Sequence, residues 1–295
     1  MHDGQQDSLI FLSYGKVPQA YETLFSILTL GRFPTPEFQG IKIRVVTDQP
    51  DFFRSYGCEV MPVSASTIEE WKGPARFEHR CKVMALKHGI GQFGGRCILV
   101  DGDTYFIRPP ARLFQRIGPG RSVMHMVEGL LADSTHEFNH RLGAFLQNAE
   151  PRADPSIKLA NGPSTVQWNA GVVGLDASDS QLLNEVLNLL DYLLEKCFAV
   201  VVEQLAFSII LAGRTQLRPS RDVIFHYNVS PMRNAFRNRI PELLAESKHM
   251  SPAALAEWLY ARRLRPSLST QARILAKDVL NTLWVLPRRD RCGCF

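Results

Sequence analysis

Two aspartates stand two residues apart directly after a short apolar run. The run extends from Cys97 to Val100, Asp101 follows it, and Gly102 separates Asp101 from Asp103. Side chains two residues apart on an extended chain point to the same side, so both carboxylates would project from the end of one buried strand. The two carboxylates repel each other unless a cation lies between them. Mg²⁺ and Mn²⁺ prefer such oxygen ligands together with the phosphates of a substrate. The pair predicts half of a metal–diphosphate site, although Asp-Gly alone is also a common turn.

The first half of the chain alternates short β-branched runs with amphipathic patterns. Strands are expected at 8–15, 41–49, 58–63 and 96–103, and helices at 17–31 and 78–90. This alternation predicts βαβ units and therefore an α/β fold with a mainly parallel sheet. Ligands of open α/β sheets bind at the carboxyl ends of the strands. Asp101 and Asp103 are thus expected at the binding edge of the sheet.

The second half is less regular. Further strands are expected at 122–128, 168–176 and 222–228, and helices at 178–197, 201–213, 251–265 and 269–286. Residues 129–165 are polar and predict a long loop or a short-helix insertion, which is where specificity often resides. No linker cleanly divides the chain. We therefore expect one domain, with its main part over 1–230 and a helical, basic C-terminal extension over 231–295.

Charge and composition narrow the class of protein. The chain is 45% hydrophobic and 21% charged, as is usual for a soluble globular protein, and it has neither a secretory signal nor a membrane-spanning run. Its six scattered cysteines are typical of reduced thiols, so a cytoplasmic location is expected. Residues 261–295 carry eight basic and two acidic side chains, whereas the rest of the chain is nearly neutral. This tail predicts peripheral contact with an anionic membrane surface, and the neutral remainder argues against a nucleic-acid partner.

Four stretches, taken in order, resemble motifs of the GT-A nucleotide-sugar glycosyltransferases, most nearly the branch around glycosyltransferase family eight. They are RCILVDGDTYF (96–106), WNAGVVGLD (168–176), VEQLAFS (202–208) and IFHYN (224–228). The resemblance covers about residues 8–230 and implies a Rossmann-like GT-A fold. The sequence departs from family eight in two respects. HYNVSPM (226–232) lacks the glycine- and lysine-containing motif of that branch, and Glu203 stands where an aspartate is usual.

The resemblance also implies roles for particular residues. Asp101, Asp103 and His226 would hold Mn²⁺ or Mg²⁺ with the donor diphosphate, and Tyr14 would stack on the base. The contacts with the nucleotide and sugar would come from Ser13, Tyr14, Asp48, Arg80, Lys82, Gly102, Asn169, Ala170 and Gly171. Each of these residues also has a plain structural interpretation. Of Arg80 and Lys82, which lie in the helix expected at 78–90, one is expected to contact the phosphate or sugar and the other to be a solvated surface residue.

Glu203 and Gln204 are the candidate catalytic residues. Glu203 would serve an inverting enzyme as general base toward the acceptor hydroxyl. In a retaining enzyme, either residue would stabilise an oxocarbenium-like state. An ordinary first-turn glutamate, favoured by the helix dipole, is the alternative interpretation.

These features predict a metal-dependent glycosyltransferase that moves a sugar from a UDP-sugar to a glycan, a glycolipid or another hydroxyl acceptor. Two other functions remain open. One is a haloacid-dehalogenase-like phosphatase that uses Asp101 and Asp103, although that family places its motif near the N-terminus. The other is a non-catalytic GT-A-like binding scaffold.

Overall fold

The computed structural model describes residues 6–34, 40–56, 58–197, 200–228, 232–247 and 249–265, together with Ala272 and Ala276. The helix expected at 269–286 and most of the basic tail lie outside these residues. No helix in the described ranges is long and apolar enough to cross a membrane.

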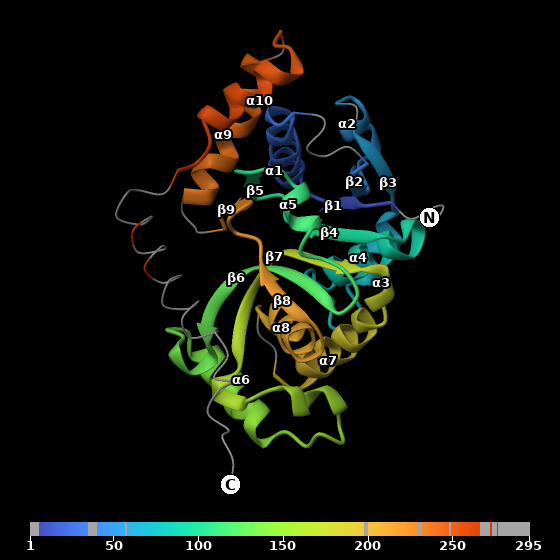
Figure 1. The fold of residues 1–295 in the computed structure, drawn as a ribbon, viewed down its shortest axis with the longest axis vertical. Helices are drawn as coiled ribbons and strands as arrows, with labels where there is room; N and C mark the ends of the chain where they lie inside the picture. The colour runs from blue at the N-terminus through green and yellow to red at the C-terminus, as the bar shows by residue number, and fades with distance from the viewer. Residues whose placement is uncertain are drawn as a thin grey trace.

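A seven-stranded sheet forms the centre of the molecule, in the order β3-β2-β1-β4-β7-β6-β8 (Figure 1). The strands are β1 Ser8–Ser13, β2 Lys42–Thr47, β3 Glu59–Pro62, β4 Arg96–Val100, β6 Arg121–Leu130, β7 Val166–Asp176 and β8 Gln216–Pro219. Within the described sheet, β7 alone runs antiparallel to its neighbours. A separate antiparallel pair joins β5 (Thr104–Phe106) to β9 (Ile224–His226). The prediction of a mixed, mainly parallel sheet flanked by helices is confirmed.

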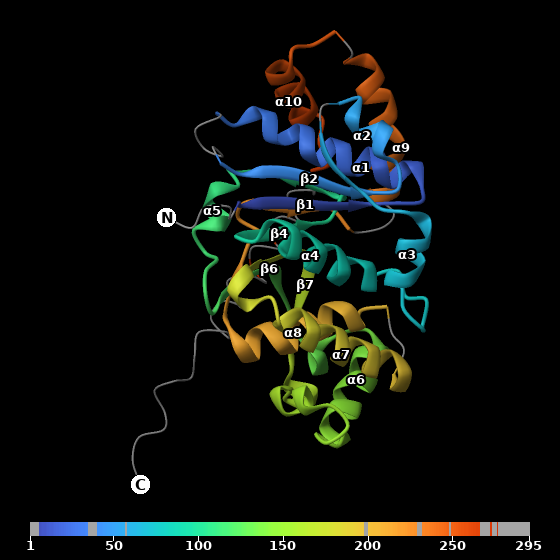
Figure 2. The same cartoon turned by 90° about the vertical axis from the view of Figure 1, so that its right-hand side faces the viewer.

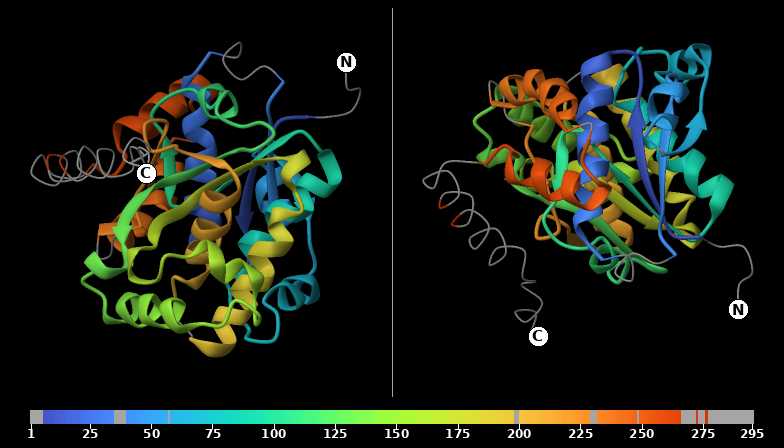
Figure 3. Two further views of the ribbon diagram at one scale, coloured as in Figure 1. Left: turned by 60° about the horizontal axis from the view of Figure 1, so that its bottom comes forward. Right: turned by 90° about the horizontal axis from the view of Figure 1, so that it is seen from above.

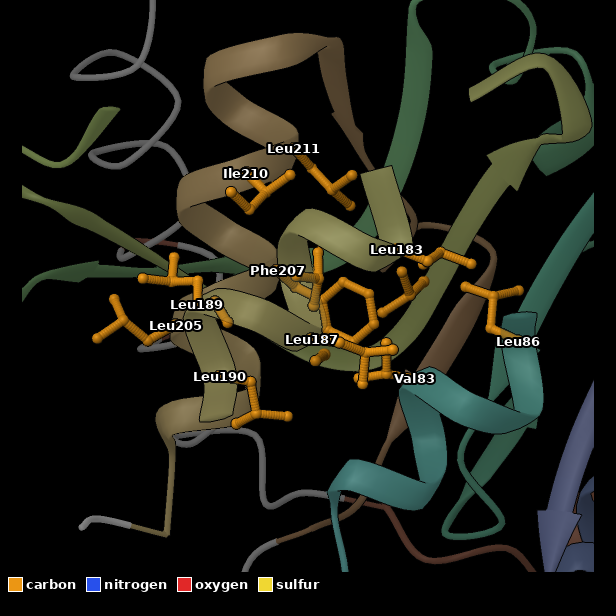
Figure 4. Packing of buried hydrophobic residues seen from close by; sticks show 14 of the residues in the cluster. Val83, Leu86, Leu183, Leu187, Leu189, Leu190, Leu205, Phe207, Ile210 and Leu211 are labelled. Carbon is orange, nitrogen blue, oxygen red and sulfur yellow. The ribbon is translucent and has the colours of Figure 1, made fainter. Parts of the chain in front are cut away.

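Helices cover both faces of the sheet (Figure 2). They are α1 Val17–Leu28, α2 Pro50–Arg54, α3 Ala65–Trp71, α4 Arg80–Phe93, α5 Ala111–Phe114, α6 Glu137–Asn148, α7 Leu182–Lys196, α8 Val202–Arg214, α9 Met232–Glu246 and α10 Pro252–Ala261. Alternate residues of β1 enter different cores: Leu9 and Phe11 pack with α1, α9 and α10, whereas Ile10 packs with α4, α7 and α8. Figure 4 shows leucines of α7 meeting Phe207 of α8 and Val83 of α4. Burial on both faces explains why the strand sequences are continuously apolar.

Several elements lack a sequence signal strong enough to predict them. Of the two alternatives expected for 129–165, a long loop or a short-helix insertion, the structure has the second: the segment contains α6 and three short 3₁₀ turns, whose bounds the sequence did not predict. The strand expected at 96–103 ends at Val100, and β5 begins separately at Thr104. The elements β5, β8, α2, α3 and α5 are too short to show a periodic pattern. The helix α9 was also missed, because Pro241 lies inside it and its polar sequence is only weakly amphipathic.

The helices after residue 230 belong to the core of the main fold. Seen from above, α9 and α10 lie beside α1 (Figure 3). Phe236 of α9 meets the ring of Phe25 edge-on, with the ring centroids 5.0 Å apart. The hydroxyl of Tyr105 in β5 donates a hydrogen bond to the carbonyl of Leu264, 2.9 Å away. One continuous hydrophobic cluster therefore spans residue 230, where the sequence suggested a boundary between the catalytic unit and the extension.

Candidate active site

The end of β4 and the β5–β9 pair bring three candidate metal ligands together. Asp101 follows the last residue of β4, and Asp103 precedes Thr104, the first residue of β5. Thr104 pairs with His226 across the two strands, which sets the histidine beside Asp103. Ligand atoms of Asp101, Asp103 and His226 all lie within 4.8 Å of one another. Residues more than 120 positions apart in the chain thus meet at the carboxyl end of a central strand.

The geometry of this group fits a small divalent ion. The Nε2 atom of His226 lies 3.3 Å from Oδ1 of Asp103 and 3.9 Å from Oδ2 of Asp101. Two ligands at right angles, each about 2.1 Å from one ion, are roughly 3 Å apart, so small side-chain rotations would close the group. Asp103 is only 4% exposed, which excludes a solvated turn as the explanation for its carboxylate. Two carboxylates and an imidazole are donors that suit Mn²⁺ or Mg²⁺.

Asn169 of β7 determines which nitrogen of His226 faces the carboxylates. Its Oδ1 atom accepts from the backbone N–H of Gly171 and lies 2.9 Å from Nδ1 of His226. Its Nδ2 atom donates to Glu128, 2.9 Å away, so the orientation of the amide is fixed. Because an amide oxygen only accepts, Nδ1 of His226 carries a hydrogen and Nε2 is left for a metal. A Cβ atom at Gly171 would lie 2.3 Å from Nδ1 of His226, which explains the glycine.

Glu128, at the far end of β6, holds three side-chain amides in place. Its Oε1 atom accepts from Asn169, and its Oε2 atom accepts from Gln167 at 3.1 Å and from Gln204 at 2.8 Å. The carboxylate thereby connects the neighbour of His226 to Gln204, a predicted catalytic residue. Sequence analysis did not select Glu128. Glu128 is the last residue of the strand predicted at 122–128, much as Asp101 directly follows β4. This position at a strand end is a signal from which Glu128 could have been predicted.

Lys82 of α4 is shared between two carboxylates and a carbonyl. Its Nζ atom lies 3.0 Å from Oδ2 of Asp101 and 3.4 Å from Oε1 of Glu203, and it donates to the carbonyl of Ala170 at 2.9 Å. Burial alone would lower the pKa of Lys82. The negative charges of Asp101 and Glu203 together have the larger effect and raise this pKa above its ordinary value, so the ammonium stays charged. Burial raises the pKa of Glu203 to about 7 against the opposing effect of Lys82, with a smaller increase from Asp101. Glu203 is therefore a buried carboxyl group that titrates near neutral pH.

Two arginines of α9 complete the surroundings of Asp103. The Nη1 atom of Arg233 lies 3.0 Å from Oδ2 of Asp103, and its Nε and Nη2 atoms donate to Glu22, each at 3.1 Å. Arg237 binds the same glutamate at 2.8 Å. Burial raises the pKa of Asp103, but His226 and Arg233 outweigh it and hold the pKa well below the usual range of a carboxyl group. Neither arginine was predicted from the sequence, because no motif marks them and α9 itself was not predicted.

These groups line one cleft of about 540 Å³. Of the predicted site residues, the cleft gathers Ser13, Tyr14, Asp48, Lys82, Asp101, Gly102, Asp103, Asn169, Gly171, Glu203, Gln204 and His226. Tyr14 donates its hydroxyl to the carbonyl of Glu78, and the Asp48 carboxylate accepts from the N–H of Gly15. The buried hydroxyl of Ser13 has no hydrogen-bond partner among the described residues. Ser13 ends β1, Tyr14 follows it, and Asp48 follows β2, so all three lie at the same edge of the sheet as the candidate metal ligands.

Two predicted residues lie apart from the cleft, and one has a packing role within it. Arg80 points to α7, where its Nε and Nη2 atoms donate to Asp191 at 2.8 and 3.0 Å. Of the two basic residues of this helix that were predicted for the site, Arg80 and Lys82, the structure brings Lys82 to it. Ala170 contributes its carbonyl to Lys82. Gly102 packs so closely on α1 that a Cβ atom there would lie 2.5 Å from Oγ1 of Thr23.

No protein-family model matches the chain, and no curated protein matches it. Several solved glycosyltransferase structures are similar at low identity. The glycosyltransferase GlyE of Streptococcus pneumoniae TIGR4 is 11% identical, with a TM-score of 0.48, over 88% of this chain and 64% of that chain. Mouse xyloside xylosyltransferase 1 in its apo form is 13% identical, with a TM-score of 0.47, over 72% of this chain and 84% of that chain. Core-mannan synthase A of Aspergillus fumigatus in a Mn/GDP form is 12% identical, with a TM-score of 0.47, over 77% of this chain and 76% of that chain.

Proposed function

We propose that the protein is a metal-dependent glycosyltransferase of the GT-A type that uses a nucleotide-diphosphate sugar, with UDP as the nucleotide. The observation that supports this most strongly is the group formed by Asp101, Asp103 and His226. It lies in a cleft at the carboxyl ends of parallel strands, where α/β proteins bind nucleotides. When bound there, Mn²⁺ or Mg²⁺ would neutralise charge on the diphosphate as the nucleotide leaves.

The chain's own residues would supply the remaining chemistry. Ser13, Tyr14 and Asp48 would contact the nucleoside, because they lie in the same cleft beyond the ends of β1 and β2. Lys82 would keep Asp101 in place and add positive charge near the diphosphate. Asn169 would fix the tautomer of His226 and retains one amide hydrogen for a sugar hydroxyl.

Glu203 and Gln204 are the proposed groups nearest the reacting sugar. A carboxyl group whose pKa is about 7 suits a general base that removes the proton of an acceptor hydroxyl, as an inverting reaction requires. In a retaining reaction, Gln204, held by Glu128, would instead stabilise the positive charge that develops on the sugar. The anomeric configuration of the product distinguishes the two reactions.

The proposed acceptor is a glycan or a glycolipid. A glycolipid would agree with the concentration of positive charge over 261–295, which would draw the protein to an anionic surface. The last continuous described segment ends at Arg265, just after α10, and α10 lies beside α1.

Release of nucleoside diphosphate from a panel of UDP- and GDP-sugars tests this function. The protein is incubated with each donor in Mn²⁺ or in EDTA, beside a variant with Asp101→Asn and Asp103→Asn. We expect release from at least one donor in Mn²⁺ and none in EDTA or from the variant. Metal-dependent release of inorganic phosphate from simple phosphomonoesters would instead identify a phosphatase.

A further inference from the structure

One guanidinium group lies between the candidate metal site and a buried carboxylate. Arg233 uses its Nε and Nη2 atoms on Glu22, which is 1% exposed, and its Nη1 atom on Asp103. A guanidinium has five N–H donors, and these contacts use three of them. Its side chain is 27% exposed and lines the cleft. As far as the described residues show, one N–H on Nη1 and one on Nη2 therefore remain for a ligand in the cleft.

The two oxygens of Asp103 face different partners. Oδ1 lies 3.3 Å from His226, on the side of the candidate metal ligands, whereas Oδ2 lies 3.0 Å from Arg233. A divalent ion held by Asp103 would therefore share its carboxylate with a fixed positive charge. This charge weakens the attraction between Asp103 and the ion, because like charges so close together repel in a partly buried site.

A diphosphate reverses the sign of this effect. It brings several negative charges and unpaired oxygens next to the ion, and a planar guanidinium binds such oxygens through paired, charge-assisted hydrogen bonds. Arg233 is already held in place by Glu22, so little side-chain entropy is lost when a phosphate oxygen binds.

We propose that Arg233 couples metal binding to diphosphate binding: it opposes the ion alone and favours the ion together with the donor diphosphate. The inference rests on the proposed function, since it requires a nucleotide-diphosphate ligand in this cleft. The site would then bind its metal chiefly as a metal–nucleotide complex, and the donor would determine when the ion is retained.

Arg237 provides a matched control. It lies one helical turn after Arg233 and binds the same Glu22, but within the described residues it has no ion pair with Asp103. Replacing either arginine leaves Glu22 paired with the other, so Arg233→Gln and Arg237→Gln are both expected to fold. A role confined to holding α9 against α1 would affect the two variants alike.

Calorimetric titration of the full chain tests the proposal, first with Mn²⁺ alone and then with UDP, and separately GDP, in saturating Mn²⁺. We expect Arg233→Gln to bind Mn²⁺ alone more tightly than wild type by a few-fold, and to bind the nucleotide about tenfold or more weakly. Arg237 also lines the cleft but has no ion pair with Asp103 among the described residues, so Arg237→Gln should match wild type within about twofold for Mn²⁺ alone and should lose less nucleotide affinity than Arg233→Gln. Arg233→Lys, which keeps the charge but loses the planar fork, should restore the Mn²⁺ affinity and only part of the nucleotide affinity.

Three results would overturn the inference. If Arg233→Gln weakens Mn²⁺ and nucleotide together, or if both arginine variants behave alike, Arg233 has only a structural role, and the proposed function survives. If wild type binds neither UDP nor GDP in Mn²⁺, the proposed function and the inference fail together.

Discussion

At the scale of single residues, each candidate metal ligand contacts one polar side chain that orients it. That side chain in turn contacts a glutamate. Lys82 contacts Asp101 and lies near Glu203, Arg233 links Asp103 to Glu22, and Asn169 links His226 to Glu128. Partners of this kind fix the rotamers and tautomers of ligands and so contribute to metal affinity. The site consequently depends on more residues than the three that would touch an ion.

Replacement of Asn169 tests the contact that orients His226. We expect Asn169→Ala to weaken Mn²⁺ binding by about 10–100-fold, because the imidazole loses the acceptor that selects its tautomer. Gln167→Ala is the control, since Gln167 donates to the same Glu128 but makes no hydrogen bond with His226 in the described part of the chain. Equal losses in both variants, measured by calorimetry, would mean that Glu128 rather than the tautomer of His226 is decisive.

Glu203 makes a specific contribution to the pH dependence of stability. Its pKa is about 7 in the folded protein, against 4.5 for the unperturbed group. Between these values the folded state binds more protons than the unfolded state, so the free energy of unfolding falls as pH rises through this window. Each unit of difference in pKa corresponds to about 1.4 kcal/mol.

Denaturant unfolding in EDTA, from pH 4.5 to 7.5, measures this contribution. Glu203→Gln keeps the shape of the side chain without the titration, so its stability should decline less steeply with pH than that of wild type. Parallel curves for the two proteins would show that Glu203 is ionised in the fold throughout this range, contrary to the account.

At the scale of elements, the long buried strands and the amphipathic helices were predictable, whereas the short pieces that join them were not. The apolar runs at β1, β2 and β4 and the leucine repeat of α7 are visible because both faces of the strands and one face of the helix are buried. β5 has only three residues, too few for any periodicity, although it aligns Asp103 with His226. Its partner β9 was predicted through the histidine it carries.

Strand β7 approaches the metal site so closely that a side chain at residue 171 is excluded. A Cβ atom there would lie 2.3 Å from Nδ1 of His226, in a buried stretch of β7. We expect Gly171→Ala to lower the free energy of unfolding by about 1–3 kcal/mol and to abolish metal binding, because the imidazole must move. In Gly91→Ala the new methyl group meets nothing within 4 Å, so this helical control should be neutral or stabilising. Thermal unfolding and Mn²⁺ titration of both variants check this, and unaltered Mn²⁺ binding by Gly171→Ala would contradict it.

Helix α4 contributes one basic residue to the site and another to packing. Arg80 binds Asp191 of α7 through two hydrogen bonds, while Lys82 faces Asp101. We expect Arg80→Ala to lower the free energy of unfolding by about 1 kcal/mol and to leave nucleotide affinity unchanged. Lys82→Ala should weaken nucleotide binding in the same assay. A large loss of affinity in Arg80→Ala would restore the role that the sequence suggested for it.

At the scale of the whole molecule, the site is assembled from both ends of the described chain. α9 packs on α1 and carries Arg233 to Asp103, and the hydroxyl of Tyr105 binds the chain just after α10. Sequence motifs predicted the residues that would touch the ion or substrate, because those chemistries need particular side chains. Arg233 and Glu22 carry no such local signal, since only the packing of distant helices makes them neighbours of the site, whereas Glu128 is marked only by its position at the end of a predicted strand.

The most direct test of the central claim is calorimetric binding of UDP with Mn²⁺, with Mn²⁺ omitted, and to the variant with Asp101→Ala and Asp103→Ala. The account predicts that wild type binds UDP only with the metal, and that the double substitution abolishes binding while the far-ultraviolet circular dichroism stays that of a folded protein. Binding of UDP that is unaffected by removing the metal or the two aspartates would contradict a metal–diphosphate site at the end of β4.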